Sequence, residues 1–347
     1  MEMQYTTYLL AVLLICTSCQ KEKDQTAVED SLTLQRNNAE MPVYIYGNAA
    51  SKVFVIVLHG GPGGNGLAYR NGVWEERLED NYAMVYWDQR GGGMAQGNLD
   101  ASNLNIAEME KDLAALNKVI KFKYGEDISL FLFGHSWGCF YGSSAFINTS
   151  IQEEYVGWIF ANGTYNWCTL IDDEVEAFLS IGSEQIQAGN NVAYWQEQVL
   201  IAQNYNNTNC NDFSINGEAH IAEQTLTESG VIEIVETTQT TLNSNFIQNN
   251  FVLTNLQGLL LNNFLFEDDD FTLLSLTDDL DKITLPTLVI AGLYDMVTPL
   301  QTAQTYFDAI GSAEKELFIL EKSGHQSMFT EPQLLANEVI SFIEKNR

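Results

Sequence analysis

The pentapeptide GHSWG at residues 134–138 constrains the fold of this chain more than any other segment. It follows the apolar run ISLFLF, which is typical of a strand buried in a sheet, and it precedes CFYGSSAFI, which fits a helix. A serine between two such elements lies on a sharp turn, and the flanking glycines allow the backbones to pack closely. The turn presents the hydroxyl of Ser136 and places the amide of Trp137 at the start of the helix, where it can bind an oxyanion. Since both elements are present, the segment predicts that Ser136 is a nucleophile.

A glycine-rich loop, HGGPGG at residues 59–64, directly follows the continuous apolar pattern VFVIVL. Glycines are needed here because backbone amides must approach a substrate carbonyl without side chains in the way. A plain glycine-rich turn is the alternative, but the position after a buried strand and before the serine turn argues against it. We expect Gly61 to be the second oxyanion donor beside Trp137, and its neighbours stay open as donors.

Asp295 and His325 complete a set in the chain order serine, aspartate, histidine. Each follows a predicted strand, TLVIA for Asp295 and ELFIL for His325, so both are expected where the loops converge on one edge of the sheet. His325 would take the proton from Ser136, and Asp295 would fix the tautomer of His325. The other histidines of the chain lie in the glycine-rich loop, the serine turn and the middle region: His59, His135 and His220.

Strand and helix patterns alternate along most of the chain. Apolar runs typical of buried strands occur at 53–58, 82–87, 128–133, 156–160, 287–291 and 316–320, and helical periodicity occurs at 106–122 and 334–343. This alternation predicts an α/β fold with a mostly parallel sheet flanked by helices. Residues 164–282 do not continue this alternation of strands and helices. We interpret them as a helical cap inserted into a catalytic domain made of residues 32–163 and 283–347.

The charge of the chain limits its partners. The formal net charge is −30, and no lysine or arginine occurs between Lys123 and Lys282. Such an acidic surface repels nucleic acid and favours cationic or neutral partners. The chain also lacks histidine, cysteine and carboxylate patterns with the spacing of metal ligands, so we expect no metal or other cofactor.

The N-terminal residues read as a targeting segment. The apolar run YLLAVLLIC at residues 8–16 is too short to span a bilayer, and it is followed by Thr-Ser-Cys and then by polar residues. This pattern resembles a bacterial lipoprotein signal, in which Cys19 would carry lipid and anchor an exported protein to a membrane of the cell envelope. A plain secretory signal or a short hydrophobic anchor is the alternative. We expect residues 1–31 to be a signal and tether. In an exported chain Cys168 and Cys210 could form a disulfide, which the sequence leaves open.

Several of these motifs together resemble the proline iminopeptidases and their relatives among the α/β hydrolases. The motifs are HGGPGG at 59–64, WDQRGGG at 87–93, GHSWG at 134–138, GLYDMVTP around Asp295 and SGH ending at His325. The resemblance covers roughly residues 40–165 and 285–347 and implies an α/β-hydrolase fold. It also implies that Asp88 and Arg90 lie beside the active site and brace its loops by a charge-assisted pair or by hydrogen bonds.

The resemblance implies a serine aminopeptidase that releases N-terminal residues, often proline, from small peptides, with acidic cap residues binding the free amine. The chain departs from the family pattern at His135, where the family usually has glycine, at Ala95, where it has serine, and at 161–163, where it reads Arg-Gly and this chain reads Ala-Asn-Gly. The same core supports carboxylesterases and lactonases that act on neutral esters. A binding lipoprotein without catalytic activity is a third alternative.

Overall fold

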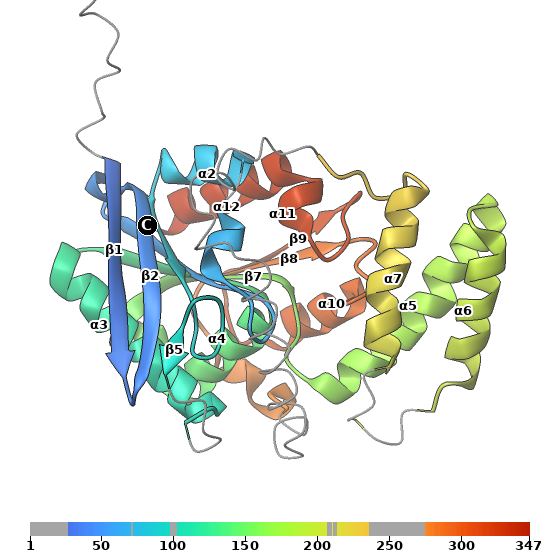
Figure 1. The fold of residues 1–347 in the computed structure, drawn as a ribbon, viewed down its shortest axis with the longest axis horizontal. Coiled ribbons are helices and arrows are strands. Elements are labelled where there is room, and N and C mark those ends of the chain that lie inside the picture. Colours follow the sequence, from blue (N-terminus) through green and yellow to red (C-terminus); the bar gives the residue numbers. More distant parts are fainter. Residues whose placement is uncertain (1–26, 71, 98–102, 207–209, 211–213, 236–274) are drawn as a thin grey trace, which may run out of the picture.

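The computed structural model describes residues 27–70, 72–97, 103–206, 210, 214–235 and 275–347 (Figure 1). The predicted signal and the lipid-carrying Cys19 lie outside these residues. Within them the strands form one sheet: β1 Ala27–Arg36, β2 Ala39–Asn48, β3 Val53–Leu58, β4 Ala83–Trp87, β5 Gln96–Gly97, β6 Ser129–Ser136, β7 Tyr155–Gly163, β8 Thr287–Gly292 and β9 Lys315–Leu320.

The sheet is mostly parallel, as the alternating pattern predicted. The strand order is β1-β2-β4-β3-β6-β7-β8-β9, with β5 paired to β2. Neighbours from β4 to β9 pair in parallel, whereas the β1–β2 hairpin joins β4 in antiparallel pairing. The hairpin was not predicted because the strands were identified from continuous apolar runs. The edge strand β1 has no such run, since its side chains alternate between more and less exposed positions. It begins at Ala27, so residues 27–31 belong to the sheet and not to the tether.

Helices cover both faces of the sheet: α2 Gly72–Glu79, α3 Ile106–Tyr124, α4 Trp137–Asn148, α10 Leu300–Ala309, α11 Ser327–Thr330 and α12 Pro332–Asn346. A hydrophobic core lies on each face of the sheet, and successive side chains of β3 point alternately into one core and the other. Its residues 54, 56 and 58 belong to the core beneath α3, α4 and α10, and its residues 53, 55 and 57 belong to the core beneath α2 and α12. Because both faces of β3 are buried, its sequence is continuously apolar.

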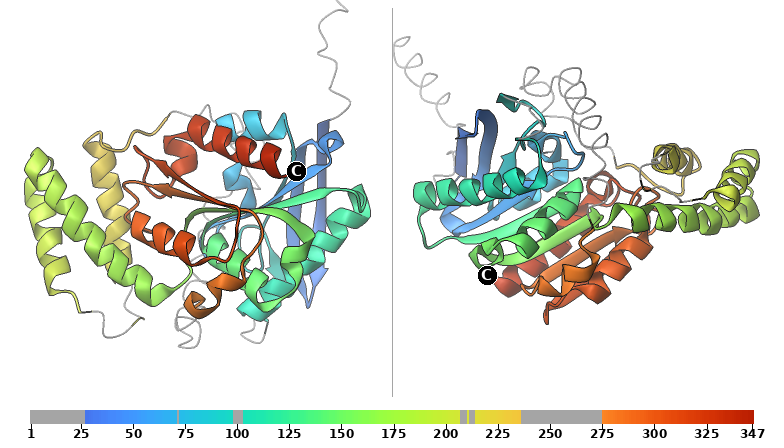
Figure 2. Two further views of the ribbon diagram at one scale, coloured as in Figure 1. Left: turned by 180° about the vertical axis from the view of Figure 1, so that it is seen from behind. Right: turned by 90° about the horizontal axis from the view of Figure 1, so that it is seen from below.

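Among the described residues, three further helices lie between β7 and β8: α5 Trp167–Ala188, α6 Val192–Asn204 and α7 Ser214–Glu228. They project from one end of the sheet (Figure 2) and share a core of their own, which reaches Met296 and Val297 of the catalytic domain. A disulfide joins Cys168 at the start of α5 to Cys210 before α7. None of the helices among the described residues combines the length and apolar character needed to cross a bilayer.

Candidate active site

Ser136 lies on a sharp turn between β6 and α4. Its backbone angles are φ 55° and ψ −120°, which is a strained conformation for a residue with a side chain. The flanking glycines allow the close packing that holds this turn. A Cβ on Gly138 would lie 2.1 Å from the carbonyl oxygen of Leu58, and a Cβ on Gly134 would lie 2.5 Å from the ring of Trp158. The strand–turn–helix context predicted from the sequence is therefore present.

His325 and Asp295 are brought together by the loops that follow β9 and β8. Nδ1 of His325 lies 3.1 Å from Oδ2 of Asp295, and both side chains are buried. Because a carboxylate only accepts hydrogen bonds, Nδ1 carries the proton and Nε2 is left as the basic nitrogen. Burial acts to lower the pKa of His325, but the charge and the hydrogen bond of Asp295 outweigh it and raise that pKa.

The carboxylate of Asp295 is held by neighbours that keep it ionised. Oδ1 accepts the backbone N–H groups of Val297 at 2.9 Å and Thr298 at 2.7 Å, and Oδ2 accepts the Thr298 hydroxyl at 2.8 Å. Asn162 at the end of β7 donates to Oδ2 at 2.8 Å. Burial acts to raise the pKa of Asp295, yet the charge of His325 and these hydrogen bonds lower it. Asp295 therefore remains a carboxylate beside the histidine.

Ser136 and His325 line one cavity of about 720 Å³. This volume lies in the usual range for small-molecule sites. Cap residues Asn216 and His220 and the ring of Trp167 form part of the lining. In the described part of the chain Ser136 makes no hydrogen bond to His325, although both residues line this cavity.

The glycine-rich loop after β3 lies directly against Ser136. A Cβ on Gly60 would approach the Ser136 Cβ to 3.2 Å, and Gly61 has φ 135° and lines the cavity. The N–H of Gly60 donates to the Tyr69 hydroxyl at 2.8 Å, so this amide already has a partner. Gly61, which the sequence predicted as an oxyanion donor, lines the same cavity as Ser136.

His135, the residue before the serine, joins two loops of the site. Its Nε2 lies 2.9 Å from the carbonyl oxygen of His325 and its Nδ1 lies 2.7 Å from the Tyr69 hydroxyl. A carbonyl only accepts, so Nε2 carries the proton and Tyr69 donates to Nδ1. Burial, with the charge of His325, lowers the pKa of His135 to about 3, so the ring stays neutral.

Asp88 and Arg90 brace the site loops, but they do not pair with each other. Asp88 accepts the N–H groups of Gly66 at 2.8 Å and Met94 at 2.9 Å. Arg90 instead forms a buried two-point ion pair with Asp112 of α3, with both N–O distances at 2.7 Å. Both bracing modes that the resemblance implied are thus present, since Asp88 accepts hydrogen bonds from backbone amides and Arg90 forms a charge-assisted pair with Asp112. Burial raises the pKa of Asp88 to about 6, against the effect of its two amide partners.

Some residues of the site had no assigned role in the sequence interpretation. They are Tyr69, Asn162, Thr298 and Glu223. Asn162 was noted only as a departure from the family pattern, although a polar residue at the end of a buried strand is itself a signal of a site. The described residues also contain no group of three or more histidine, cysteine or acidic side chains that could hold a metal ion.

The chain matches the family model described as alpha/beta hydrolase fold over residues 53–332. It belongs to the α/β hydrolase fold family. The match covers the parallel strands β3, β4 and β6 to β9 and the helices α5, α6 and α7 that lie between β7 and β8, so the chain is an α/β hydrolase.

Known proteins similar to this α/β hydrolase include peptidases and esterases. The probable aminopeptidase YbaC of Bacillus subtilis (strain 168) is 24% identical over 334 residues, which is 91% of this chain and 96% of the relative. The proline iminopeptidase of Mycobacterium smegmatis has a TM-score of 0.60 at 19% identity, with 91% of this chain and 98% of that chain covered. A thermophilic esterase from Thermogutta terrifontis has a TM-score of 0.54 at 16% identity, with coverages of 92% and 99%. The predicted resemblance to the proline iminopeptidase relatives is confirmed.

Proposed function

We propose that this α/β hydrolase is a serine hydrolase with Ser136 as nucleophile, His325 as general base and Asp295 as the acid that orients His325. The observation that carries the proposal is that Ser136 and His325 line the same cavity, with Asp295 bound to the buried nitrogen of His325. That leaves the Nε2 lone pair of His325 to accept a proton.

The reaction follows from this arrangement. Oγ of Ser136 attacks the substrate carbonyl carbon while its proton moves to Nε2 of His325, and the amides of Gly61 and Trp137 donate to the developing oxyanion. The bond to the leaving group then breaks, and His325 returns the proton to that group. A water molecule attacks the acyl-enzyme with His325 again as base, and this releases the acid and restores Ser136.

We propose an amide substrate with a free N-terminal amine, so that the chain acts as an aminopeptidase of the proline iminopeptidase type. The similar proteins named as a probable aminopeptidase and a proline iminopeptidase support this class. Glu174 of α5 is the cap acid that we assign to the amine. It is buried, its Oε2 has no partner among the described residues, and its Oε1 accepts from Asn216, which lines the cavity. Burial raises the pKa of Glu174 well above its ordinary value, so a bound ammonium would supply the missing positive partner.

An esterase acting on neutral esters is the second candidate. The cavity includes apolar side chains of Leu170, Met328 and Phe329, and an esterase is among the similar structures. Such a substrate would need no carboxylate in the cap.

Amine dependence separates the two candidates. We expect the full-length chain to hydrolyse proline β-naphthylamide and to refuse its N-acetylated form. Glu174→Gln should raise KM for the free amine by about 10-fold or more, because the ionic partner is lost, while Glu176→Gln on the exposed side of the same helix should leave KM unchanged. Equal turnover of both substrates, or cleavage of p-nitrophenyl esters alone, would favour the esterase.

We also propose that the chain is exported and anchored by lipid on Cys19. The pairing of Cys168 with Cys210 supports an oxidising compartment, where such disulfides persist. Metabolic labelling with palmitate should mark the native chain in a bacterial host, and Cys19→Ala should abolish the label. Label retained in that variant would contradict the anchor.

A further inference from the structure

Glu223 on cap helix α7 contacts the two loops that carry the base and the acid. Its Oε1 accepts the backbone N–H of His325 at 2.9 Å and the backbone N–H of Met296 at 2.9 Å. Met296 directly follows Asp295 in the chain. One oxygen of the cap therefore joins the histidine loop to the aspartate loop.

The second oxygen of this carboxyl fits against a glycine. A Cβ added to Gly324, the residue before His325, would lie 2.8 Å from Oε2 of Glu223. The glycine at 324 therefore leaves room for the cap carboxyl beside the His325 amide. The same helix carries Asn216 and His220 to the cavity lining. A single helix thus contacts both the substrate space and the backbone that supports the reacting groups.

We propose that Glu223 is a positioning residue, which holds the loops of Asp295 and His325 in register and stabilises the positive charge that His325 acquires during the reaction. This inference rests on the proposed serine hydrolase function. Glu223 itself does not touch the substrate, and it acts through His325.

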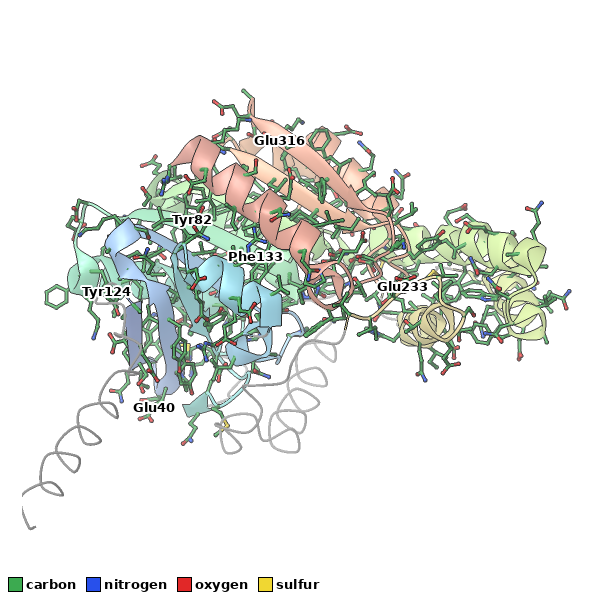
Figure 3. The ribbon with its side chains drawn as sticks, turned by 90° about the horizontal axis from the view of Figure 1, so that it is seen from above. Glu40, Tyr82, Tyr124, Phe133, Glu233 and Glu316 are labelled. Atoms are coloured by element: carbon green, nitrogen blue, oxygen red, sulfur yellow. A yellow bond between two sulfur atoms is a disulfide. The ribbon has the colours of Figure 1, made fainter. Side chains whose placement is uncertain are left out.

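The chain after α7 also contacts the segment of residues 322–329 that follows β9. The N–H of Val235 donates to the carbonyl oxygen of Phe329 at 3.0 Å, and Nζ of Lys322 lies 3.8 Å from Oε1 of Glu233. Glu233 lies at the junction of the cap with the catalytic domain (Figure 3). These contacts are at the surface, whereas the Glu223 contact reaches the loops of the site.

The charged groups around Glu223 determine how its effect depends on pH. Asp295 and His325 face it from the catalytic loops, and His220 precedes it on its own helix. Two further charged groups lie on neighbouring segments. Glu174 of α5 accepts a hydrogen bond from Asn216 of α7, and the ammonium of Lys322 pairs with Glu233 at the surface. Burial, and then the charge of Asp295, raise the pKa of Glu223 to about 8.

Two protonation states follow from this arrangement. In the neutral state Oε1 remains a carbonyl oxygen and still accepts both amides, so the loops stay in register. In the charged state, above about pH 8, the carboxylate adds a negative charge beside His325 and favours its protonated form. Glutamine copies the neutral state because its carbonyl oxygen can accept the same two amides. Alanine copies neither state and leaves two amides without their acceptor.

The experiment compares Glu223→Gln, Glu223→Ala and the control Glu228→Gln, which changes an exposed acid of the same helix. Each full-length protein is assayed with p-nitrophenyl acetate from pH 6 to 10, after circular dichroism has shown that it is folded. At pH 7 we expect Glu223→Gln to keep kcat within about 3-fold, and Glu223→Ala to lose about 10- to 100-fold in kcat with little change in KM. The wild type and Glu228→Gln should show a further rise in kcat around pH 8 that Glu223→Gln lacks.

Two results would overturn the assignment. One is a Glu223→Ala enzyme with the kcat and pH profile of the wild type. The other, which stays informative even if the alanine variant fails to fold, is a Glu223→Gln enzyme with an unaltered rise near pH 8 or with a large loss at pH 7. An active wild type with an insensitive Glu223 refutes only this inference. A wild type that cleaves no ester or amide through Ser136 refutes the proposed function as well.

Discussion

The side-chain nitrogen of Asn162 donates to Oδ2 of Asp295 at 2.8 Å, and this is the same oxygen that faces Nδ1 of His325. Ser327 in turn donates to the side-chain oxygen of Asn162 at 2.7 Å, which fixes the orientation of the amide. Asn162 has φ 47°, a left-handed conformation that asparagine, aspartate and glycine tolerate best. The end of β7 thus contributes a donor that keeps Asp295 charged and turned toward His325.

Asn162→Asp should impair the enzyme through charge. A second carboxylate beside Asp295 would raise the pKa of Asp295, since two adjacent like charges disfavour ionisation. We expect the acid limb of the kcat profile to move upward by about one to three pH units. Asn162→Gly, which removes the donor without straining the backbone, should lower kcat by less than about 10-fold, because Val297 and Thr298 still hold Asp295. An Asn162→Asp enzyme with the wild-type pH profile would contradict this role.

Arg90→Ala should destabilise the fold and not only the site. The substitution leaves Asp112 buried with only part of its positive partner, since Arg36 keeps one hydrogen bond to it. Removal of one member of a buried pair costs about 3–5 kcal/mol, and the contact with Arg36 places the loss toward the lower value. Urea unfolding measures it. Lys111→Ala, which breaks an exposed pair with Glu108, is the control and should cost less than about 1 kcal/mol.

His135 should make stability fall in acid. Its pKa is about 3 in the folded protein and about 6.5 when unfolded, so below pH 6.5 the unfolded chain binds a proton that the folded chain excludes. The stability that comes from the neutral ring is full above pH 6.5 and is lost as the pH falls toward 3. Between pH 6.5 and 5 the loss is about 2 kcal/mol, and His135→Gln should lack it. Parallel urea unfolding of both proteins at the two pH values tests this, and equal losses would refute it.

The disulfide between Cys168 and Cys210 should stabilise the cap. It closes a loop with a sequence separation of 42 residues, for which chain entropy gives about 4 kcal/mol. We expect a reductant to lower the melting temperature of the wild type to that of the Cys168→Ser, Cys210→Ser double variant. The double variant itself should not respond, because the remaining described cysteine, Cys139, is buried in the core. An unresponsive wild type would show that the bond adds nothing to stability.

The central strands could be predicted because burial on both faces makes each of them a continuous apolar run. β3 was placed from Val53 to Leu58 in this way. The β1–β2 hairpin was missed because an edge strand has no such run. The turn of Ser136 could be predicted for a related reason, since its glycines and its flanking elements are adjacent in the sequence.

Contacts between distant segments could not be predicted. Glu223 meets His325 across 102 positions and Asn162 meets Asp295 across 133. The sequence around Glu223 has no feature that distinguishes this residue from the many other acidic residues of the cap. The partners of Asp88 and Arg90 could not be predicted either, since the fold directs Arg90 toward α3 and Asp88 toward two backbone amides.

Covalent labelling with a fluorophosphonate tests the central claim most directly. The full-length wild type should form one adduct, which peptide mapping places on Ser136, and the labelling rate should fall as the pH drops below the raised pKa of His325. Ser136→Ala should take no label, and Asp295→Asn should react about 10⁴-fold more slowly. A label that persists in Ser136→Ala, or a folded wild type that takes none, would contradict the claim, and the second result would favour a binding protein that only keeps the fold.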